Sequence, residues 1–524
     1  MIDKILAVLR SIGLLLIGIF VAALALGSFI YNSVYPDIGF EKVEVVHDNI
    51  LLNVLVSVGL LVILFFLMRV LFARLTPAIE SAVAKFSSAV ILVAGFGFGR
   101  LFGNSSLLYD ARRVFDFAHA SAAGDVAKAF DAPYFKAYPF QVGMALYEEF
   151  FFRVFGVENT HIFTILILMN AILLTLFFYF LYKATCLLFD TLQVSIIVLV
   201  LEVTCLPAFM MCHFVYGLIP YMTLSMIAIY FQLKFLRCEK RWYYFVISAV
   251  AIGVAAVLKP NSDIWVIAMA LLYIWELIKN FSWKKLLALG LAVFCVVTFP
   301  LGVKNLYAAR TGEPVHEAMP ELAYLAMGLQ NEPVKIYPGW FNHWHYRFVD
   351  HVEKGEKTPL FLQKDGPEKV KARAKESIEE SVHKYLTDPH LGFEFFKGKF
   401  LSEWENPNFG VYVYQRSIVE HKQMPRVQMS LAYGKLHTAA SWFMNAYHLI
   451  VSVFALFGLW LLRRNGKLDV LIFAIIAYGG FLYHLLFEAK DMYTLPYFLI
   501  LIPYAALGIY SLFELVNKKR TEKR

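Results

Sequence analysis

The chain has 524 residues, of which 59% are hydrophobic and 17% charged, and its mean hydropathy is +0.60. This apolar surface exceeds what one water-soluble core can bury, so the composition excludes an ordinary soluble protein and predicts a bilayer as the solvent. The net charge of +8 comes mostly from basic residues that flank apolar runs, so it does not indicate a nucleic-acid partner.

Twelve apolar runs are long enough to be membrane-spanning helices. They cover residues 12–30, 51–68, 86–102, 162–182, 194–211, 214–233, 243–258, 264–278, 286–301, 443–462, 470–487 and 495–515. Several of the middle runs are short, so a re-entrant segment is an alternative for one or two of them. The first run lacks a small-residue cleavage site, so we expect an anchor and not a signal peptide.

Basic residues follow every second apolar run, for example Arg69 and Arg74 after the second and Lys518 and Lys519 after the last. Short loops rich in lysine and arginine stay in the cytoplasm. We therefore predict a multi-pass protein of the cell membrane with both termini cytoplasmic. All five cysteines lie in or near apolar runs, so the polar segments carry no disulfide framework.

This topology leaves two polar segments on the external face, residues 103–161 and 304–437. The predicted organisation is an N-terminal pair of spans (1–85), a core of spans that contains the first polar segment (86–303), a small, mostly helical external domain (304–437), and C-terminal spans (438–524). In the external domain, Val370, Ala374, Ile378 and Val382 have the spacing of one helix face, which predicts a helix over residues 367–386.

The first polar segment carries the most informative residues. Asp110 follows the third apolar run, Asp125 follows Gly124, and Tyr138 precedes a proline. The aromatic stretch over residues 145–156 is too short to span a bilayer and is apolar on one side, which predicts a helix along the membrane interface.

With these residues the chain resembles the polyprenyl-phosphate-sugar-dependent glycosyltransferases of the GT-C fold, a group that includes the protein O-mannosyltransferases and bacterial enzymes that glycosylate the cell envelope. The matching positions are Asp110, Asp125, Tyr138-Pro139, Gly143, Phe155-Gly156, Lys259-Pro260-Asn261, Met327-Gly328, Gly339, Asn342, Trp404, Pro407, Glu488 and Tyr493. Two features depart from the family pattern. Met492 stands where the group often has arginine, and two spans precede those of the usual core.

The resemblance implies an all-α polytopic membrane protein with a GT-C-like bundle of about twelve helices. It has a large external loop with juxtamembrane helices and a small helical external domain. It also implies transfer of a sugar from a polyprenyl-phosphate donor to a cell-envelope acceptor, which is a polysaccharide, a teichoic-acid-like polymer, a lipid or a protein. The transfer is expected to be inverting and to occur at the external face. The catalytic residues expected from it are Asp110 and Asp125, and the substrate-binding residues are Arg112, Tyr138, Gln141, Lys259, Asn342, Glu488, Lys490 and Tyr493. No metal ligands are expected, although a divalent cation stays open as a cofactor.

The chemistry of such a transfer needs a base for the acceptor hydroxyl and cationic or hydrogen-bonding groups around the phosphate. Asp110 suits the base, with helix capping as the alternative. Lys259 and Lys490 suit the phosphate, with snorkelling to water as the alternative. His343 and His345 invite a metal site but lack an obvious third ligand. Glu202 lies inside the fifth apolar run, where a carboxyl group is costly and often functional.

Two other functions compete with this interpretation. A transporter or flippase of lipid-linked sugars would show inverted repeats and paired charges near the midplane, whereas the charges here cluster at span ends. A glycan polymerase or ligase would share the external site and the lipid donor, but such proteins usually place key arginines in large late loops.

Overall fold

A computed structural model describes residues 2–35, 43–102, 107, 109–127, 133–239, 241–315, 318–330, 339–340, 352, 357–420 and 425–521. The apolar helices in chain order are α1 (Ile2–Ile30), α2 (Ile50–Phe72), α3 (Pro77–Phe102), α8 (Ile162–Phe189), α9 (Leu192–Val203), α10 (Leu206–Met210), α11 (Leu218–Lys234), α12 (Trp242–Leu258), α13 (Ser262–Lys279), α14 (Trp283–Thr311), α21 (Lys435–Leu461), α22 (Ile472–Leu486), α23 (Asp491–Leu499) and α24 (Ile502–Thr521). Each of the twelve predicted runs is largely helical.

Eight of these helices are long and apolar enough to cross a membrane: α1, α2, α3, α8, α11, α14, α21 and α22. Two bent pairs, α9 with α10 and α23 with α24, bring the number to ten. The remaining two predicted spans are α12, with 17 residues, and α13, with 18 residues that include Asp263, Glu276 and Lys279. The chain is a multi-pass helical membrane protein with eight to ten spans by length and composition in the described part, fewer than the twelve expected.

The two bent pairs share a sequence cause. The axes of α9 and α10 differ by 48°, and those of α23 and α24 by 51°. In both pairs the second helix carries a proline as its second residue, Pro207 in α10 and Pro503 in α24. A proline has no N–H to donate to the preceding helix, so each pair breaks there.

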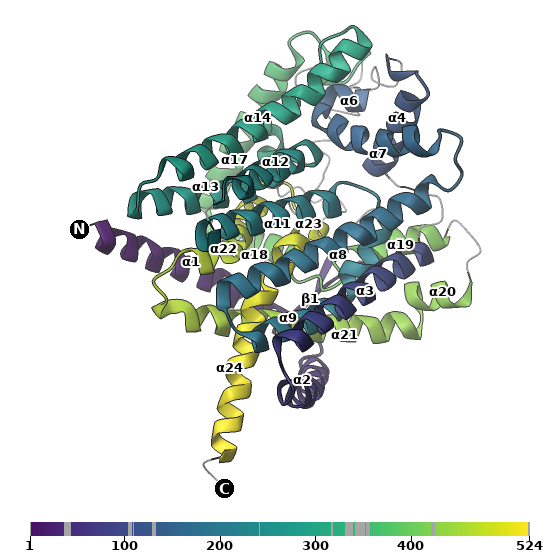
Figure 1. Cartoon of the computed structure of the whole chain (residues 1–524). Helices are drawn as coiled ribbons and strands as arrows, with labels where there is room; N and C mark the ends of the chain where they lie inside the picture. The colour runs from purple at the N-terminus through teal and green to yellow at the C-terminus, as the bar shows by residue number, and fades with distance from the viewer. Residues whose placement is uncertain are drawn as a thin grey trace.

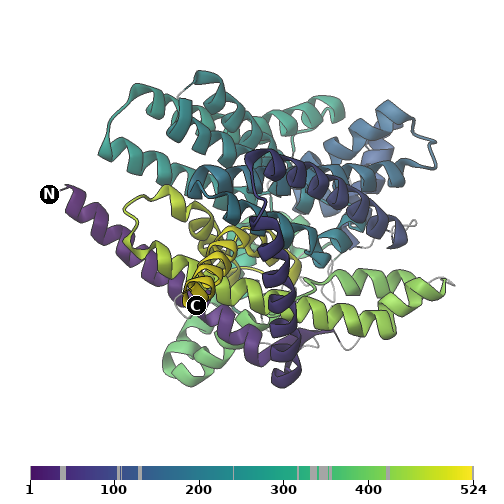
Figure 2. The same cartoon turned by 60° about the horizontal axis from the view of Figure 1, so that its bottom comes forward.

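The helices pack as a continuous bundle (Figures 1 and 2). Helix α12 packs on α11 and α14, α8 packs on α3 and α11, and α21 packs on α24 and α1. Large side chains such as Trp265, Tyr221 and Tyr504 are completely buried between them. By contrast, α2 exposes Leu51, Ile63 and further aliphatic residues on its outer surface, as expected for a helix that faces lipid.

The N-terminal pair of spans is joined by a hairpin, which forms the one β-sheet in the described residues. Strands β1 (Tyr31–Val34) and β2 (Glu44–His47) pair antiparallel with Tyr31 opposite His47. The hairpin packs on the second polar segment, where the backbone N–H of Ser33 donates to the carbonyl oxygen of Glu405 at 2.8 Å.

The two polar segments are helical as well. The first contains α4 (Tyr109–Ala122), α6 (Pro133–Ala137), η1 (Pro139–Gln141) and α7 (Val142–Phe155), and the second contains α15 (Glu321–Gly328), η4 (Leu360–Leu362), α17 (Gly366–Thr387), α18 (Pro389–Trp404), α19 (Val411–Glu420) and α20 (Arg426–Tyr433). A small apolar core joins them, because Ala137 of α6 packs with Ala326 of α15 and Val370 of α17. The predicted helix over 367–386 is α17, although Val382 is exposed instead of sharing the buried face.

Candidate functional site

Lys259 lies at the centre of the candidate site, directly after α12. Pro260 follows it and prevents the helix from continuing, so the lysine stands at the helix end. Its side chain is only 9% exposed, and Nζ lies 4.9 Å from the ring centroids of both Tyr216 and Tyr493. Cations attract the faces of aromatic rings, and these two rings separate the ammonium group from water. This burial speaks against snorkelling for Lys259.

Charged groups from two other segments act on this lysine. Burial lowers the pKa of Lys259 to about 8, and the positive charge of Lys490 lowers it further, while Glu488 and Asp110 oppose the shift. Two ammonium groups in a partly dry site repel each other, and an anion between them would be attracted by both. The arrangement therefore favours an anion between Lys259 and Lys490.

Asp110 and the residues around Tyr216 form the opposite side of the site. Asp110 lies in the first turn of α4, where a carboxylate complements the helix dipole, and its side chain is exposed. Burial raises the pKa of Tyr134 and Tyr216, and the charge of Asp110 raises both further, so the carboxylate faces these phenols. Gln141 donates from its amide nitrogen to the hydroxyl of Tyr216.

Helix α7 is fixed against the end of α12 by a close backbone approach. A Cβ atom at Gly143 would lie 1.8 Å from the carbonyl oxygen of Val257, two residues before Lys259. Any side chain here would push α7 away from α12. Gly143, a residue of the family pattern, thus holds Gln141 near Lys259.

The loop over residues 487–491 carries Glu488 and Lys490, and a buried lysine anchors it. Lys399 of α18 is fully buried, and its Nζ donates to the carbonyl oxygens of Gly328 at 2.8 Å and Phe487 at 2.5 Å. Burial lowers the pKa of Lys399 to about 8, against the opposing charges of Glu403 and Glu488. The lysine therefore ties α15, α18 and this loop together.

Gly328 allows the loop to pack directly on α15. A Cβ atom there would lie 2.2 Å from the carbonyl oxygen of Leu486 and 2.5 Å from that of Phe487. On the other side of the loop, Ala489 donates its N–H to the carbonyl oxygen of Gly339 at 2.8 Å. The positions of Glu488 and Lys490 thus depend on contacts made by the second polar segment.

Asp491 ends this loop in a buried hydrogen-bonded position. Its Oδ2 accepts from the hydroxyl of Tyr35 at 2.7 Å and from the amide of Asn406 at 2.5 Å. Tyr35 follows the N-terminal hairpin, so the first pair of spans contributes to the support of the site. The sequence predicts this pair of spans as an N-terminal unit that precedes the usual core, and it predicts no contact between that unit and the site.

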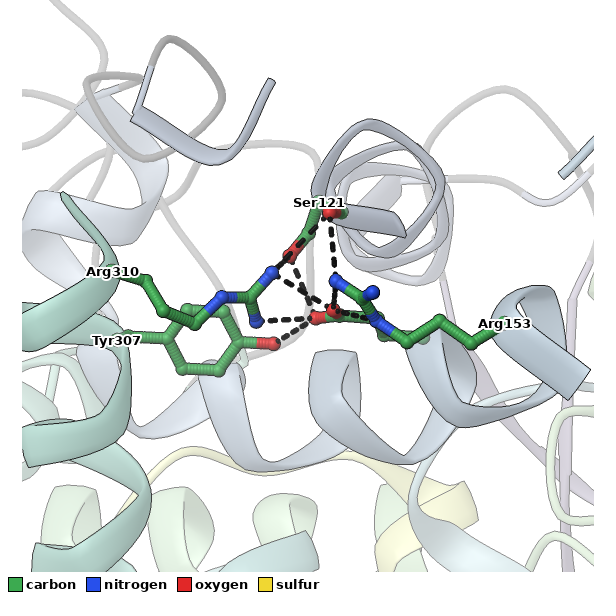
Figure 3. A network of polar contacts seen from close by, with 5 residues as sticks. Ser121, Arg153, Tyr307 and Arg310 are labelled. Atoms are coloured by element: carbon green, nitrogen blue, oxygen red, sulfur yellow. Dashed lines mark hydrogen bonds and ion pairs between the residues drawn. The ribbon is translucent and has the colours of Figure 1, made fainter. Parts of the chain in front are cut away.

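A second polar network joins α4, α7 and α14 (Figure 3). Glu149 of α7 is 1% exposed, and its carboxylate accepts from Ser121 at 2.6 Å, Tyr307 at 2.7 Å, Arg153 at 2.7 Å and Arg310 at 3.0 Å. Burial alone would raise the pKa of Glu149, but these donors, Arg310 foremost, lower it to about 2. The network locks the C-terminal ends of α4 and α7 together, while Asp110 and Gln141 at their N-terminal ends face the site.

Glu148, the neighbour of Glu149, behaves in the opposite way. It is completely buried, neither of its oxygens has a hydrogen-bond partner among the described residues, and burial raises the pKa of its carboxyl well above the ordinary value. The outward side of α7 carries Phe150, Val154 and Phe155 instead. The helix thus has an apolar outer face, while both glutamates point inward.

Some of the site residues predicted from the sequence lie together around Lys259, and others lie elsewhere. Asp110, Gln141, Lys259, Glu488, Lys490 and Tyr493 converge on one site, and the half-buried Tyr138 lies beside Tyr134 with ring centroids 5.0 Å apart. Arg112 is bound instead to Asp116 at 2.7 Å on the solvent-exposed side of α4, whereas Arg113 lies over the ring of Tyr134 at 5.0 Å.

Asp125 is separated from Asp110 by the length of α4. The twelve helical steps from Asp110 to Ala122 span roughly 18 Å, and Asp125 lies exposed beyond that end. The pairing of the two aspartates in one centre is therefore not seen. Asn342, His343 and His345 lie outside the described residues.

Several residues of the site were not predicted. Tyr216 lies inside the apolar run over residues 214–233, and the roles of Lys399 and Asp491 depend on contacts with residues distant in sequence. Two features of the sequence could have indicated the site: the Lys259-Pro260 pair that ends α12, and Gly143 and Gly328, where helices and loops approach closely. Within the described ranges, no three His, Cys, Asp or Glu side chains are grouped to hold a metal ion.

The intramembrane carboxyl of Glu202 lies apart from this centre. It is completely buried in α9, and its oxygens have no hydrogen-bond partner among the described residues. No opposite charge pairs with it in the structure as described, so the paired midplane charges of a transporter are not seen there.

Comparison with known proteins gives no family assignment. No protein-family model matches the sequence, and no curated protein matches it. The structure is similar to that of ArnT from Cupriavidus metallidurans in the apo state, with a TM-score of 0.35, 15% identity, and coverage of 83% of this chain and 78% of that chain. For ArnT from the same organism bound to undecaprenyl phosphate, the TM-score is 0.34, the identity 16%, and the coverage 81% and 77%. Both TM-scores lie below 0.5, so this likeness by itself assigns neither a fold family nor an activity.

Proposed function

We propose that the protein is a membrane glycosyltransferase that moves a sugar from a polyprenyl-phosphate donor to a cell-envelope acceptor at the external face. The observation that supports this most is the convergence of two lysines and a carboxylate, Lys259, Lys490 and Asp110, from three segments far apart in the sequence. The family pattern in the sequence includes Asp110 and Lys259, whereas Lys490 stands near Met492, where the group often has arginine.

In the proposed reaction, the lipid phosphate lies between Lys259 and Lys490. The carboxylate of Asp110 takes the proton of an acceptor hydroxyl, whose oxygen attacks the anomeric carbon of the donor sugar. The bond from that carbon to the phosphate oxygen breaks, and its electron pair stays on the lipid phosphate. The lysines stabilise the charge that develops there, and attack from the opposite side inverts the anomeric centre.

The site is also compatible with binding a lipid-linked sugar for transport. A flippase would need the phosphate-binding lysines but no base, so Asp110 distinguishes the two activities. A polymerase or ligase of lipid-linked glycans would need both and would differ in its acceptor.

The test compares two aspartate variants in the native host. Asp110→Asn is expected to abolish one envelope sugar, while Asp125→Asn, the matched control outside the site, is expected to retain it. Envelope glycans are analysed by mass spectrometry, and membrane abundance of each variant is measured by immunoblot. An unchanged glycan in Asp110→Asn at normal abundance would refute the assignment of the base.

A direct binding test addresses the donor. Undecaprenyl phosphate, the lipid in one of the ArnT structures, serves as the probe for the purified protein. Binding to the wild type and loss of binding in Lys259→Met would support the phosphate site. Equal binding by both would contradict it.

A further inference from the structure

A pocket lies between α3 and α8, at the end of both helices that is distant from the first polar segment. It has a volume of about 280 Å³, and its walls include Ser81, Lys85 and Ser88 of α3 and Tyr179 and Lys183 of α8. Lys85 lies roughly 25 Å along α3 from Phe102, the last residue of this helix before the first polar segment. The pocket, which we call the lysine pocket, is therefore separate from the candidate site.

Two ammonium groups share the lysine pocket, one from each helix. Lys85 is exposed, and Lys183 is half-buried with its Nζ 5.6 Å from the ring centroid of Tyr182. In the described part of the chain neither lysine forms an ion pair, and the nearby carboxylate of Glu80 accepts from the thiol of Cys186 at 3.5 Å instead. Even with that carboxylate counted, the pocket keeps a net positive charge, which attracts an anion.

A serine hydroxyl adds a neutral donor to these charges. Ser81 is exposed and makes no hydrogen bond through its side chain with another described residue, so its hydroxyl can donate to a ligand. The hydroxyl of Ser88 donates to the carbonyl oxygen of Ala84 at 2.9 Å and has only lone pairs to offer. An anion in this pocket would therefore meet Lys85, Lys183 and Ser81.

The helix surfaces that continue from the lysine pocket towards the middle of both helices are apolar. On α8, Leu176 and Tyr179 are exposed and share one helix face with Lys183. On α3, Phe86 and Val93 are 70% and 72% exposed. Exposed aliphatic and aromatic residues on a spanning helix face lipid chains. A ligand with a charged headgroup and acyl chains fits both parts of this surface, whereas a free anion would contact only the pocket.

We infer that the lysine pocket binds the headgroup of an anionic phospholipid of the bilayer. The lipid phosphate would lie between Lys85 and Lys183, and the acyl chains would follow the apolar faces of α3 and α8. The basic residues that follow α2, Arg69 and Arg74 among them, predict that this end of the bundle is cytoplasmic. Anionic lipids give the cytoplasmic leaflet a negative surface potential, and basic pockets between helices bind their headgroups there.

Native mass spectrometry of the full chain in a neutral detergent tests this binding. The probes are phosphatidylglycerol, whose headgroup is anionic, phosphatidylcholine, whose headgroup has no net charge, and inorganic phosphate as a competitor. Phosphatidylglycerol is expected to bind about tenfold more tightly than phosphatidylcholine. Equal binding of the two lipids would overturn the inference. Displacement of phosphatidylglycerol by an equal concentration of inorganic phosphate would identify a site for a free anion and would overturn it as well.

A variant in the pocket wall makes the test specific to this place. Ser81→Glu adds a carboxylate beside the lysines at an exposed position. Ala82→Glu adds the same charge at the next residue, which is exposed and does not line the pocket, so it is the matched control. Ser81→Glu is expected to weaken binding of phosphatidylglycerol about tenfold, while Ala82→Glu retains it. Equal loss in both variants would overturn the inference, because the charge of the whole surface would then explain the binding.

Removal of the lysines gives a second variant. Lys85→Gln/Lys183→Gln should lose the preference for phosphatidylglycerol. Lys279→Gln/Lys284→Gln, which removes two exposed lysines outside the pocket, should keep it. Thermal unfolding in detergent checks that each double variant is folded. A preference that survives in folded Lys85→Gln/Lys183→Gln would overturn the inference.

Undecaprenyl phosphate separates this inference from the proposed function. Lys259→Met should lose undecaprenyl phosphate and keep phosphatidylglycerol, whereas Ser81→Glu should do the opposite. If Ser81→Glu loses undecaprenyl phosphate instead of phosphatidylglycerol, the pocket binds the polyprenyl lipid and the phospholipid inference fails. If Lys259→Met keeps undecaprenyl phosphate while Ser81→Glu loses phosphatidylglycerol, the proposed function fails and the lysine pocket stands.

Discussion

Replacing Lys259 with methionine is expected to stabilise the fold while removing ligand binding. The native site keeps the pKa of this lysine at about 8 instead of 10.5, which corresponds to roughly 3 kcal/mol of disfavoured charge at neutral pH. The contacts of the ammonium group with the rings of Tyr216 and Tyr493 offset about 1–2 kcal/mol of this cost. Methionine fills similar space without a charge, so a net gain of about 1–2 kcal/mol in the free energy of unfolding should result.

Binding should change in the opposite direction. An ammonium group about 4 Å from a phosphate contributes about 4 kcal/mol at an effective dielectric constant of 20. Losing it should weaken binding of undecaprenyl phosphate roughly 100- to 1,000-fold.

The assay pairs thermal unfolding in detergent with lipid binding measured on the same samples. Lys259→Arg is the control, because it keeps the charge. A Lys259→Met protein that unfolds well below the wild type, or that binds the lipid as tightly, would refute this account of the site.

Three further predictions concern Lys259, Glu149 and Gly328. Affinity for undecaprenyl phosphate should begin to fall as the pH rises through about 8, where Lys259 loses its proton, and a titration of Lys259→Arg should show the fall only at higher pH. Glu149→Gln should cost about 3 kcal/mol of stability at neutral pH, since the carboxylate has a pKa of about 2 against an ordinary 4.5. Glu148→Gln should cost little, because burial raises the pKa of that carboxyl and none of the described residues donates a hydrogen bond to it. That contribution of Glu149 is complete above pH 4.5 and is lost as the pH falls towards 2, so melting curves of variant and wild type should converge in acid. Gly328→Ala should displace the loop at Phe487 and lower transfer activity at least tenfold while the protein stays folded, as judged by gel filtration and activity assay.

The membrane helices could be predicted from the sequence because apolar length is a local property. The limits of α12 and the break before Pro207 follow from residues adjacent in the chain. The exposed Val382 was not predictable in this way, because its burial depends on how far the partner of α17 extends.

The site was predictable in its residues but not in its geometry. Lys259 and Glu488 stood out as charges at the ends of apolar runs, and the structure brings them together. Lys399 was missed because its importance comes from carbonyl groups of Gly328 and Phe487, which no pattern in the sequence marks. Asp125 matched the family pattern, yet the length of α4 separates it from Asp110.

The bond between Tyr35 and Asp491 has a consequence for biogenesis. These two residues are 456 positions apart, and Arg10 of α1 likewise donates to the carbonyl oxygen of Leu462 at 2.8 Å. The hydrogen bond of Tyr35, which follows the first span and its first strand, can therefore form only after the start of α23 has been synthesised. A translation product truncated before α23 would lack Asp491 and Tyr493, and with them the contacts that these residues make with Tyr35 and Lys259.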